Sequence, residues 1–332
     1  MAYITLSRKA FFHNLNIITA QVGDTSKIAL VLKDNAYGHG LLEIATLAQE
    51  YGITRAVVRC NVEAQMIEHL FSYILVLDDI AQEKSDIVRH SINSLEQIGK
   101  FAKGSLVELK VDTGMHRNGV GMDEVEKALE LIEQHSLTCK AIFTHFRSAD
   151  TLSSEWFWQK KIFQKIQEKY QNRGFDFHSA NSAGIFRSTT CKEDMIRVGI
   201  AAYGCLELNT AFEQPNLQPV LSLIAQKQTT RLLKASQHVG YNATCKVEED
   251  TLVSTYDVGY ADGLLRSASN RHVTPNGSRI LGRISMDNVT LTCKDEEIVI
   301  YNNANEYAKT ADTIGYEVLT RLASYLERKV IS

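Results

Sequence analysis

Short apolar runs recur along the first 200 residues of the chain, separated by stretches long enough to form helices. Eight of these runs are candidate strands, at residues 28–32, 55–59, 73–77, 87–92, 106–112, 141–145, 175–180 and 195–200. Between them lie helical patterns such as residues 123–133, where apolar positions recur three and four apart. This repeated alternation predicts a parallel (β/α)8 barrel. A doubly wound open sheet is the alternative, because the second and fourth runs are short and carry charges.

The pattern changes after residue 203. Pro215 and Pro219 mark the change, and alternating apolar and polar runs follow at residues 251–256, 279–284 and 297–301, with turn signals between them. This half of the chain predicts a mostly antiparallel β domain, with one helix from about residue 311 to residue 326. We therefore expect a cofactor-binding barrel domain over residues 1–216 and a β domain over residues 217–332.

Composition narrows the class of protein. The 332 residues carry a net charge of −3, which favours neither a nucleic-acid nor an anionic membrane partner. The six cysteines are scattered without a Cys-x-x-Cys pair, as is typical of reduced thiols. The sequence shows no apolar signal core at its start and no apolar run long enough to cross a bilayer. We expect a cytoplasmic protein, with no metal site.

Chemically useful residues gather at the predicted carboxyl ends of the strands, where β/α barrels place their active sites. The first strand ends at Lys33, in a turn-rich motif over residues 33–40 whose glycines allow close approach of a ligand. An amine in this position is suited to forming a Schiff base, although a lone lysine is more often a surface residue. The later strand ends add Lys110, Arg117, His145, Asn181, Ser182, Arg197, Gly199 and Ile200. Together these groups fit a phosphate-bearing cofactor and a carboxylate substrate.

With these motifs in place, the chain resembles the pyridoxal-phosphate-dependent alanine racemases, a family built from a barrel and a β domain. Nine motifs agree in order and spacing, at residues 33–40, 110–119, 144–150, 180–184, 197–204, 239–244, 258–263, 282–287 and 315–318. The resemblance implies that L- and D-alanine are interconverted by a two-base 1,1-proton transfer on a pyridoxal phosphate aldimine, which supplies D-alanine for peptidoglycan. It also implies a homodimer with shared active sites.

Three alternative functions fit parts of this sequence pattern. A racemase of broader specificity, acting on serine or larger amino acids, is the nearest alternative. An amino-acid decarboxylase on a similar barrel generally sets a carboxylate against the cofactor's ring nitrogen, so Arg197 argues against it. A non-catalytic cofactor carrier made of a barrel alone leaves the β domain unexplained.

The resemblance assigns the central chemistry to three residues. Lys33 holds the cofactor and acts as one base. Arg197 faces the cofactor's ring nitrogen, to which a permanently protonated guanidinium can only donate a hydrogen bond. The ring is then a weaker electron sink, which favours return of the proton to Cα over transamination. Tyr241, from the partner subunit, is the second base, tuned through a hydrogen-bonded chain from Arg197 through His145.

The remaining site residues follow from the same resemblance. The phosphate is expected to contact Tyr37, Ser182, Gly199, Ile200 and Tyr316. Asn181 is either a cofactor ligand or a turn residue that bonds its own loop. Arg117 and Met286 are expected to bind the substrate, and Lys110 to be carbamylated and to orient Arg117.

Some positions depart from the family or carry no direct chemistry. Asp34 stands where the family usually has alanine, and the closing Arg-Val-Pro-Arg of the family is absent. His39 is expected to brace the loop after Lys33 and to take no part in the reaction.

Overall fold

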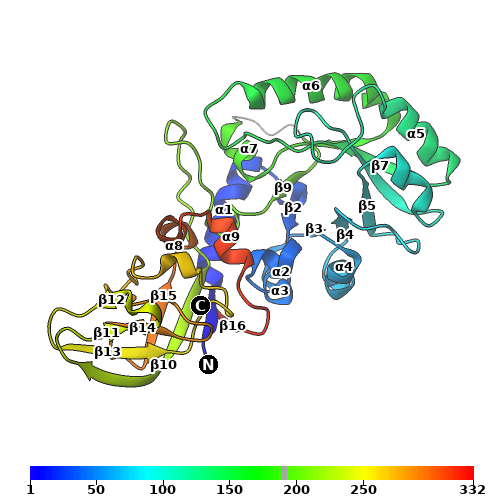
Figure 1. The fold of residues 1–332 in the computed structure, drawn as a ribbon. Helices are drawn as coiled ribbons and strands as arrows, with labels where there is room; N and C mark the ends of the chain where they lie inside the picture. Colours follow the sequence, from blue (N-terminus) through cyan, green and yellow to red (C-terminus); the bar gives the residue numbers. More distant parts are fainter. Residues whose placement is uncertain (189–192) are drawn as a thin grey trace.

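The computed structural model describes residues 1–188 and 193–332, and its first sheet is the predicted barrel (Figure 1). Eight parallel strands pair in the order β8-β7-β6-β5-β4-β3-β2-β9. Their bounds are β2 (Ile28–Val31), β3 (Arg55–Val58), β4 (Tyr73–Val76), β5 (Val88–Ile92), β6 (Leu106–Lys110), β7 (Thr138–Phe143), β8 (Asp176–His178) and β9 (Ile196–Val198). Two backbone hydrogen bonds, from Arg197 to Ala180 (3.0 Å) and from Asp194 to Phe177 (3.3 Å), join the last two strands and nearly close the ring. The predicted barrel is confirmed.

Helices cover the outside of the barrel. They are α1 (Arg8–Val22), α3 (Leu41–Tyr51), α4 (Asn61–Ile67), α5 (Val125–Gln134), α6 (Glu155–Tyr170) and α7 (Ser182–Arg187). The short element α2 (Lys33–Tyr37) is a left-handed turn that follows β2. The ends of α1 show how local sequence sets these bounds. The Ser7 hydroxyl accepts the Ala10 N–H and caps the first turn, and Gly23 ends the helix at φ 85°. Strands β2 and β4 are buried at every position, as expected for parallel strands covered on both faces.

The second sheet is mostly antiparallel, as predicted. It contains β1 (Tyr3–Ser7), β10 (Leu221–Leu233), β13 (Thr251–Tyr256), β14 (Val289–Leu291), β15 (Glu297–Tyr301) and β16 (Glu327–Ile331). A small hairpin of β11 (His238–Val239) and β12 (Cys245–Lys246) accompanies it. Strand β1 pairs with β10 antiparallel and with β16 parallel, so both ends of the chain lie in this sheet. The sequence pattern did not predict this place for residues 3–7, and the division at residue 216 stays a prediction.

The prediction of a single helix over residues 311–326 was wrong. Helix α8 (Ala304–Ala311) ends where the predicted helix would begin, and α9 (Gly315–Thr320) covers only part of the predicted range. Asp312 adopts a left-handed conformation at φ 55° and ends α8, which breaks the helical path between the two. Helix α9 then packs against the loop after Lys33, where a Cβ on Gly38 would lie 2.0 Å from the carbonyl oxygen of Leu319.

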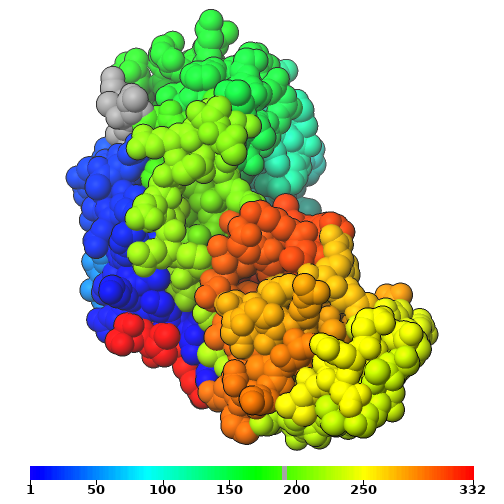
Figure 2. Space-filling model, turned by 90° about the vertical axis from the view of Figure 1, so that its left-hand side faces the viewer, coloured from blue at the N-terminus to red at the C-terminus, as the bar shows by residue number. Residues whose placement is uncertain are grey.

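The β domain forms one end of an elongated molecule. In Figure 2 it is drawn in yellow and orange, and the barrel in blue to green. Five of the cysteines are free thiols, as expected, and the sixth, Cys191, lies outside the described residues. Within residues 1–188 and 193–332, no helix combines the length and the apolar character needed to cross a membrane.

Candidate active site

Lys33 stands at the mouth of the barrel because β2 ends directly before it and a tight left-handed turn follows. Four consecutive residues, 34–37, have φ between 52° and 56°. Each costs on the order of 1–2 kcal/mol for a residue with a Cβ, so the turn must be held by its surroundings. Asn35 supplies part of this support. Its N–H donates to Glu63 Oε1 (3.1 Å), and its Oδ1 accepts the Leu41 N–H (2.8 Å).

His39 braces the same turn, as predicted. Its fully buried ring lies with Nδ1 3.1 Å from the carbonyl oxygens of both Ala36 and Tyr37. The ring also stacks on Tyr203, with centroids 4.4 Å apart. Burial lowers the pKa of His39 to about 4, so the ring is neutral near pH 7. It donates its Nδ1–H to the turn and leaves the reaction to other groups.

The Lys33 amine is accessible and paired. Its side chain is 35% exposed, and Nζ lies 3.4 Å from Asp34 Oδ2. The same carboxylate lies 3.3 Å from Arg59 Nη1. Asp34 therefore links the reactive amine to a second cation at the rim.

Ser182 and the turn after β9 form a small polar cradle. The Ser182 hydroxyl accepts the N–H groups of Gly199 (3.0 Å) and Ala201 (3.3 Å). The Ile200 N–H, between them, donates to no acceptor among the described residues. Asn181 caps α7, since its Oδ1 accepts the Gly184 N–H (2.9 Å). Its side chain is thus used by its own loop, and a contact with a cofactor stays a prediction.

Two tyrosines border this cradle. Tyr37 and Tyr316 have ring centroids 5.9 Å apart, although they come from opposite ends of the chain. A Cβ on Gly199 would lie 2.7 Å from the Tyr37 hydroxyl oxygen, so only glycine allows this approach. Neither hydroxyl forms a hydrogen bond with a residue that the structure describes. They are donors without protein acceptors, next to the free N–H of Ile200.

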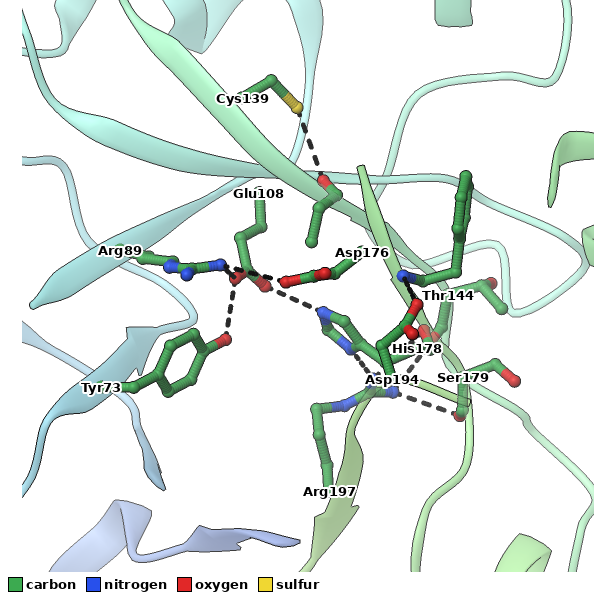
Figure 3. Close-up of polar contacts among 12 residues, drawn as sticks. Tyr73, Arg89, Glu108, Cys139, Thr144, Asp176, His178, Ser179, Asp194 and Arg197 are labelled. Carbon is green, nitrogen blue, oxygen red and sulfur yellow. Dashed lines mark hydrogen bonds and ion pairs between the residues drawn. The ribbon is translucent and has the colours of Figure 1, made fainter. Parts of the chain in front are cut away.

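Arg197 is buried and fixed from one side (Figure 3). Its Nη1 donates to His178 Nδ1 and more weakly to the His178 carbonyl (3.4 Å), while Nη2 donates to the carbonyls of Thr144 (2.6 Å) and Ser179 (3.3 Å). All four terminal N–H groups are therefore used, and among the described residues Nε–H alone has no acceptor. The hydrogen bond expected between Arg197 and His145 is not formed, because His178 takes its place.

His145 instead lies within a cluster of cations. Burial, together with the charges of Arg197, Lys110, Arg117 and Lys33, lowers its pKa to about 3. Burial also lowers the pKa of Lys110 to about 8, assisted by the two guanidinium groups. These neighbouring cations make the barrel mouth a site for anions.

Arg117 faces open space. It lines a pocket of about 570 Å³ together with Asn93, Asp112 and His116. The loop that carries it is fixed by Asp112, whose Oδ1 accepts the N–H groups of Gly114 (2.9 Å) and His116 (3.0 Å). A guanidinium held over a pocket in this way suits recognition of a carboxylate.

Comparisons with known proteins agree with this geometry. The family described as "Alanine racemase, N-terminal domain" matches residues 6–207, and "Alanine racemase, C-terminal domain" matches residues 220–330. The chain belongs to the alanine racemase family. It is 44% identical over 335 residues to an alanine racemase of Nitratiruptor sp., covering 99% of each chain. It is 38% identical over 340 residues to one of Campylobacter curvus, covering both chains in full.

Solved alanine racemases share the fold. The enzyme of Clostridium difficile superposes with a TM-score of 0.90 at 23% identity, covering 99% of this chain and 95% of that one. The enzyme of Bacillus anthracis, whose crystal structure contains bound L-Ala-P, superposes with a TM-score of 0.89 at 25% identity, covering 100% of this chain and 95% of that one. Alanine racemases are isomerases that use pyridoxal phosphate, so the predicted enzyme class is confirmed.

Of the site residues predicted in the β domain, Tyr316 borders the barrel mouth, whereas Tyr241 lies apart from it. Tyr241 opens a short 3-10 turn (Tyr241–Ala243) between β11 and β12 and is 65% exposed. Figure 1 shows these two strands on the side of the β domain away from the barrel strands. Met286 is 55% exposed. Within one chain, therefore, the structure does not bring Tyr241 to Lys33.

Four polar residues inside the barrel were missed by the sequence reasoning: Tyr73, Arg89, Glu108 and His178. Glu108 is fully buried in the middle of β6 and hydrogen-bonds to the other three. A charge within an apolar strand was the available signal, because a buried carboxylate requires partners. The sequence could not show which residues those partners are.

Proposed function

We propose that this member of the alanine racemase family interconverts L- and D-alanine with pyridoxal phosphate as its cofactor. We further propose a homodimer, in which each site combines the barrel of one subunit with the β domain of the other. The observation that carries the proposal is Arg197, fixed at the barrel mouth with one donor left free. The relative from Bacillus anthracis, solved with bound L-Ala-P, is consistent with this assignment.

The unpartnered groups at the barrel mouth fit the cofactor. The Lys33 amine would hold its aldehyde carbon. The hydroxyls of Tyr37 and Tyr316 and the Ile200 N–H are free donors that would contact its phosphate, with Ser182 beside them. When bound, pyridoxal phosphate would draw electron density from the Cα of alanine and make its proton acidic enough to leave.

Arg197 would favour racemisation over other reactions at the same carbon. Its Nε–H is the one donor left for the cofactor's ring nitrogen. A guanidinium has no acceptor and keeps its proton at any working pH, so it can give the ring a hydrogen bond and no proton. By withholding a proton from that nitrogen, Arg197 would favour return of the proton to Cα.

Racemisation needs proton acceptors on both faces of Cα, and Lys33 can serve only one. Tyr241 would serve the other face from the second subunit. Its phenol is 65% exposed and, like Met286, belongs to a surface of the β domain that one chain leaves uncovered. The partner subunit's Tyr241 would then face Lys33 across the substrate, and the partner subunit's Met286 would help Arg117 to hold it.

The test follows both the configuration and the hydrogen at Cα. Protein loaded with pyridoxal phosphate is incubated in deuterated water with single enantiomers of alanine, serine and larger amino acids. Either enantiomer of alanine should approach equal amounts of the two, with deuterium at Cα. Equal rates for serine would favour the broader-specificity alternative, and no exchange with alanine would refute the proposal.

Two variants locate the chemistry. Lys33→Ala should abolish exchange, and borohydride should no longer fix the cofactor to the chain. Lys9→Ala is the matched control, because Lys9 is exposed on α1 and far along the chain from the motif. It should keep both properties. The product, D-alanine, would be available for peptidoglycan synthesis.

A further inference from the structure

A negative charge lies inside the barrel, below the site described above. Glu108 stands two residues before Lys110 on β6, so both side chains point to the same face of the strand, into the barrel. Its side chain is fully buried. A carboxylate in such a place is stable only when donors surround it. Figure 3 shows Glu108 between Tyr73, Arg89 and His178.

The two oxygens of Glu108 have different partners. Oε1 accepts from the Tyr73 hydroxyl (2.8 Å) and from Arg89 Nη1 (3.0 Å). Oε2 accepts from His178 Nε2 (2.8 Å). Burial alone would raise the pKa of Glu108, but these hydrogen bonds and the charge of Arg89 hold it below its ordinary range. The carboxylate is therefore ionised.

These contacts fix the tautomer of His178. Nδ1 faces Arg197 Nη1, a group that can only donate, so Nδ1 must present its lone pair. Nε2 faces a carboxylate, so it must carry the hydrogen. Burial lowers the pKa of His178 and keeps the ring neutral. Phe143 stacks on the ring, with centroids 4.8 Å apart and planes at 10°, and fixes its orientation.

We propose that Glu108 is a positioning residue for the reaction: it holds His178 as the Nε2–H tautomer, and His178 in turn holds the Arg197 guanidinium with its Nε–H toward the cofactor site. The proposal rests on the proposed function of Arg197 as the donor to the cofactor's ring nitrogen. Glu108 acts through two other side chains and does not itself touch substrate or cofactor.

Glu108→Gln tests this with almost no change of shape. Arg89 faces Oε1 and can only donate, whereas His178 at Oε2 can exchange its tautomer, so the amide oxygen of glutamine takes the Oε1 position. The amide nitrogen then replaces Oε2 and presents N–H to His178 Nε2. His178 must move its hydrogen to Nδ1, where it opposes the donor Nη1 of Arg197. In a serine protease triad, replacing the aspartate by asparagine likewise leaves the histidine in the wrong tautomer.

Tyr73→Phe is the matched control. It removes one hydrogen bond to the same carboxylate but leaves the charge, and it does not touch the oxygen that faces His178. We therefore expect Tyr73→Phe to lower stability slightly and to keep the tautomer.

The measurement is 15N NMR of the full-length protein labelled only at histidine nitrogens. The His178 signals are identified by their loss in His178→Gln. The wild type and Tyr73→Phe should show a protonated Nε2 and an unprotonated Nδ1, and Glu108→Gln should show the reverse. A protonated Nδ1 in the wild type would overturn the proposal, even if Glu108→Gln fails to fold. An unchanged pattern in folded Glu108→Gln would also overturn it.

Kinetics supply the second measurement, on protein loaded with pyridoxal phosphate. Because Arg197 would contact the cofactor and not the substrate, Glu108→Gln should lower kcat for alanine racemisation roughly 10- to 100-fold, the range for outer groups that orient a functional side chain. The KM for alanine should change much less. An equal kcat would overturn the proposal. If the wild type itself fails to racemise alanine, the proposed function is wrong, while the NMR result still decides the tautomer.

Discussion

Lys110 should take up carbon dioxide under physiological conditions, because its surroundings make the amine reactive. Only a neutral amine can attack carbon dioxide. Burial first, and then Arg117 and Arg197, lower the pKa of Lys110 from 10.5 to about 8. At pH 7 about one amine in ten is then neutral, against roughly one in three thousand for an unperturbed lysine. The reactive fraction therefore rises about 300-fold.

The product would also be stabilised where it forms. A new bond joins Nζ to the carbon of carbon dioxide, and one N–H proton goes to solvent. The resulting carbamate is an anion beside the same two guanidinium groups that disfavour the ammonium form. It would reach across to Arg117 and fix its orientation over the substrate pocket, which is the role expected for Lys110.

The assay is 13C NMR of the intact protein equilibrated with labelled bicarbonate at constant dissolved carbon dioxide. Uptake should increase from pH 6 to pH 8, because the amine must lose one proton to react and the reaction releases another, and it should level off only when Lys110 is fully carbamylated. Lys110→Gln should remove the signal, and Arg117→Gln should weaken it by raising the pKa of the amine and removing a partner. Lys140→Gln, at an exposed position on β7, is the control and should change nothing. Absence of labelled carbamate at Lys110 between pH 6 and pH 9 would refute the reasoning.

Three further predictions concern the two bases and the pH dependence of stability. Tyr241→Phe should slow deuterium exchange at Cα on the order of 100-fold for one enantiomer only; equal, small losses for both would remove Tyr241 as a base. Mixing inactive Lys33→Ala and Tyr241→Ala chains should restore about one quarter of the sites, since half of the dimers are mixed and each has one native site; no recovery after proven subunit exchange would contradict shared sites. His39 is neutral in the folded protein, with its pKa lowered to about 4, whereas its unfolded value is 6.5. Its contribution to stability is therefore complete above pH 6.5 and is lost as the pH falls through 4, by up to about 3 kcal/mol. Denaturant titrations between pH 4 and pH 7 should show this loss, and His39→Gln should flatten it.

The barrel could be predicted because its strands are buried on both faces and so appear as separate apolar runs. All eight runs became strands, with bounds that differ by a few residues. The place of β1 could not be predicted in this way. Its partners are residues 221–224 and 327–331, and nothing in residues 3–7 shows which distant segments they meet. The break at Asp312 was missed for a related reason, since the apolar spacing continues across it.

The position of a residue at the barrel mouth could be predicted where a motif places it at a strand end, as for Lys33 and Ser182. The predicted partner of Arg197 was wrong, because that contact depends on which strands lie side by side. His145 comes two residues after β7 ends, whereas His178 is the last residue of β8, which lies next to β9 and Arg197 in the ring. The guanidinium therefore meets His178. No local pattern distinguishes these two histidines.

We expect the polar half of the barrel interior to serve the site more than stability. Residues of β2, β3 and β4 fill the other half with apolar side chains, including Val31, Val57 and Leu75, and Tyr73 joins the two halves. The same barrel is therefore filled without charge on one side. Buried ion pairs contribute little net stability compared with apolar side chains of similar size, because each charge loses its hydration. The proposed positioning role would explain a buried Glu108 with three donors: Glu108 would determine which nitrogen of His178 is free to hold Arg197, and so the direction of the donor that Arg197 would offer to the cofactor.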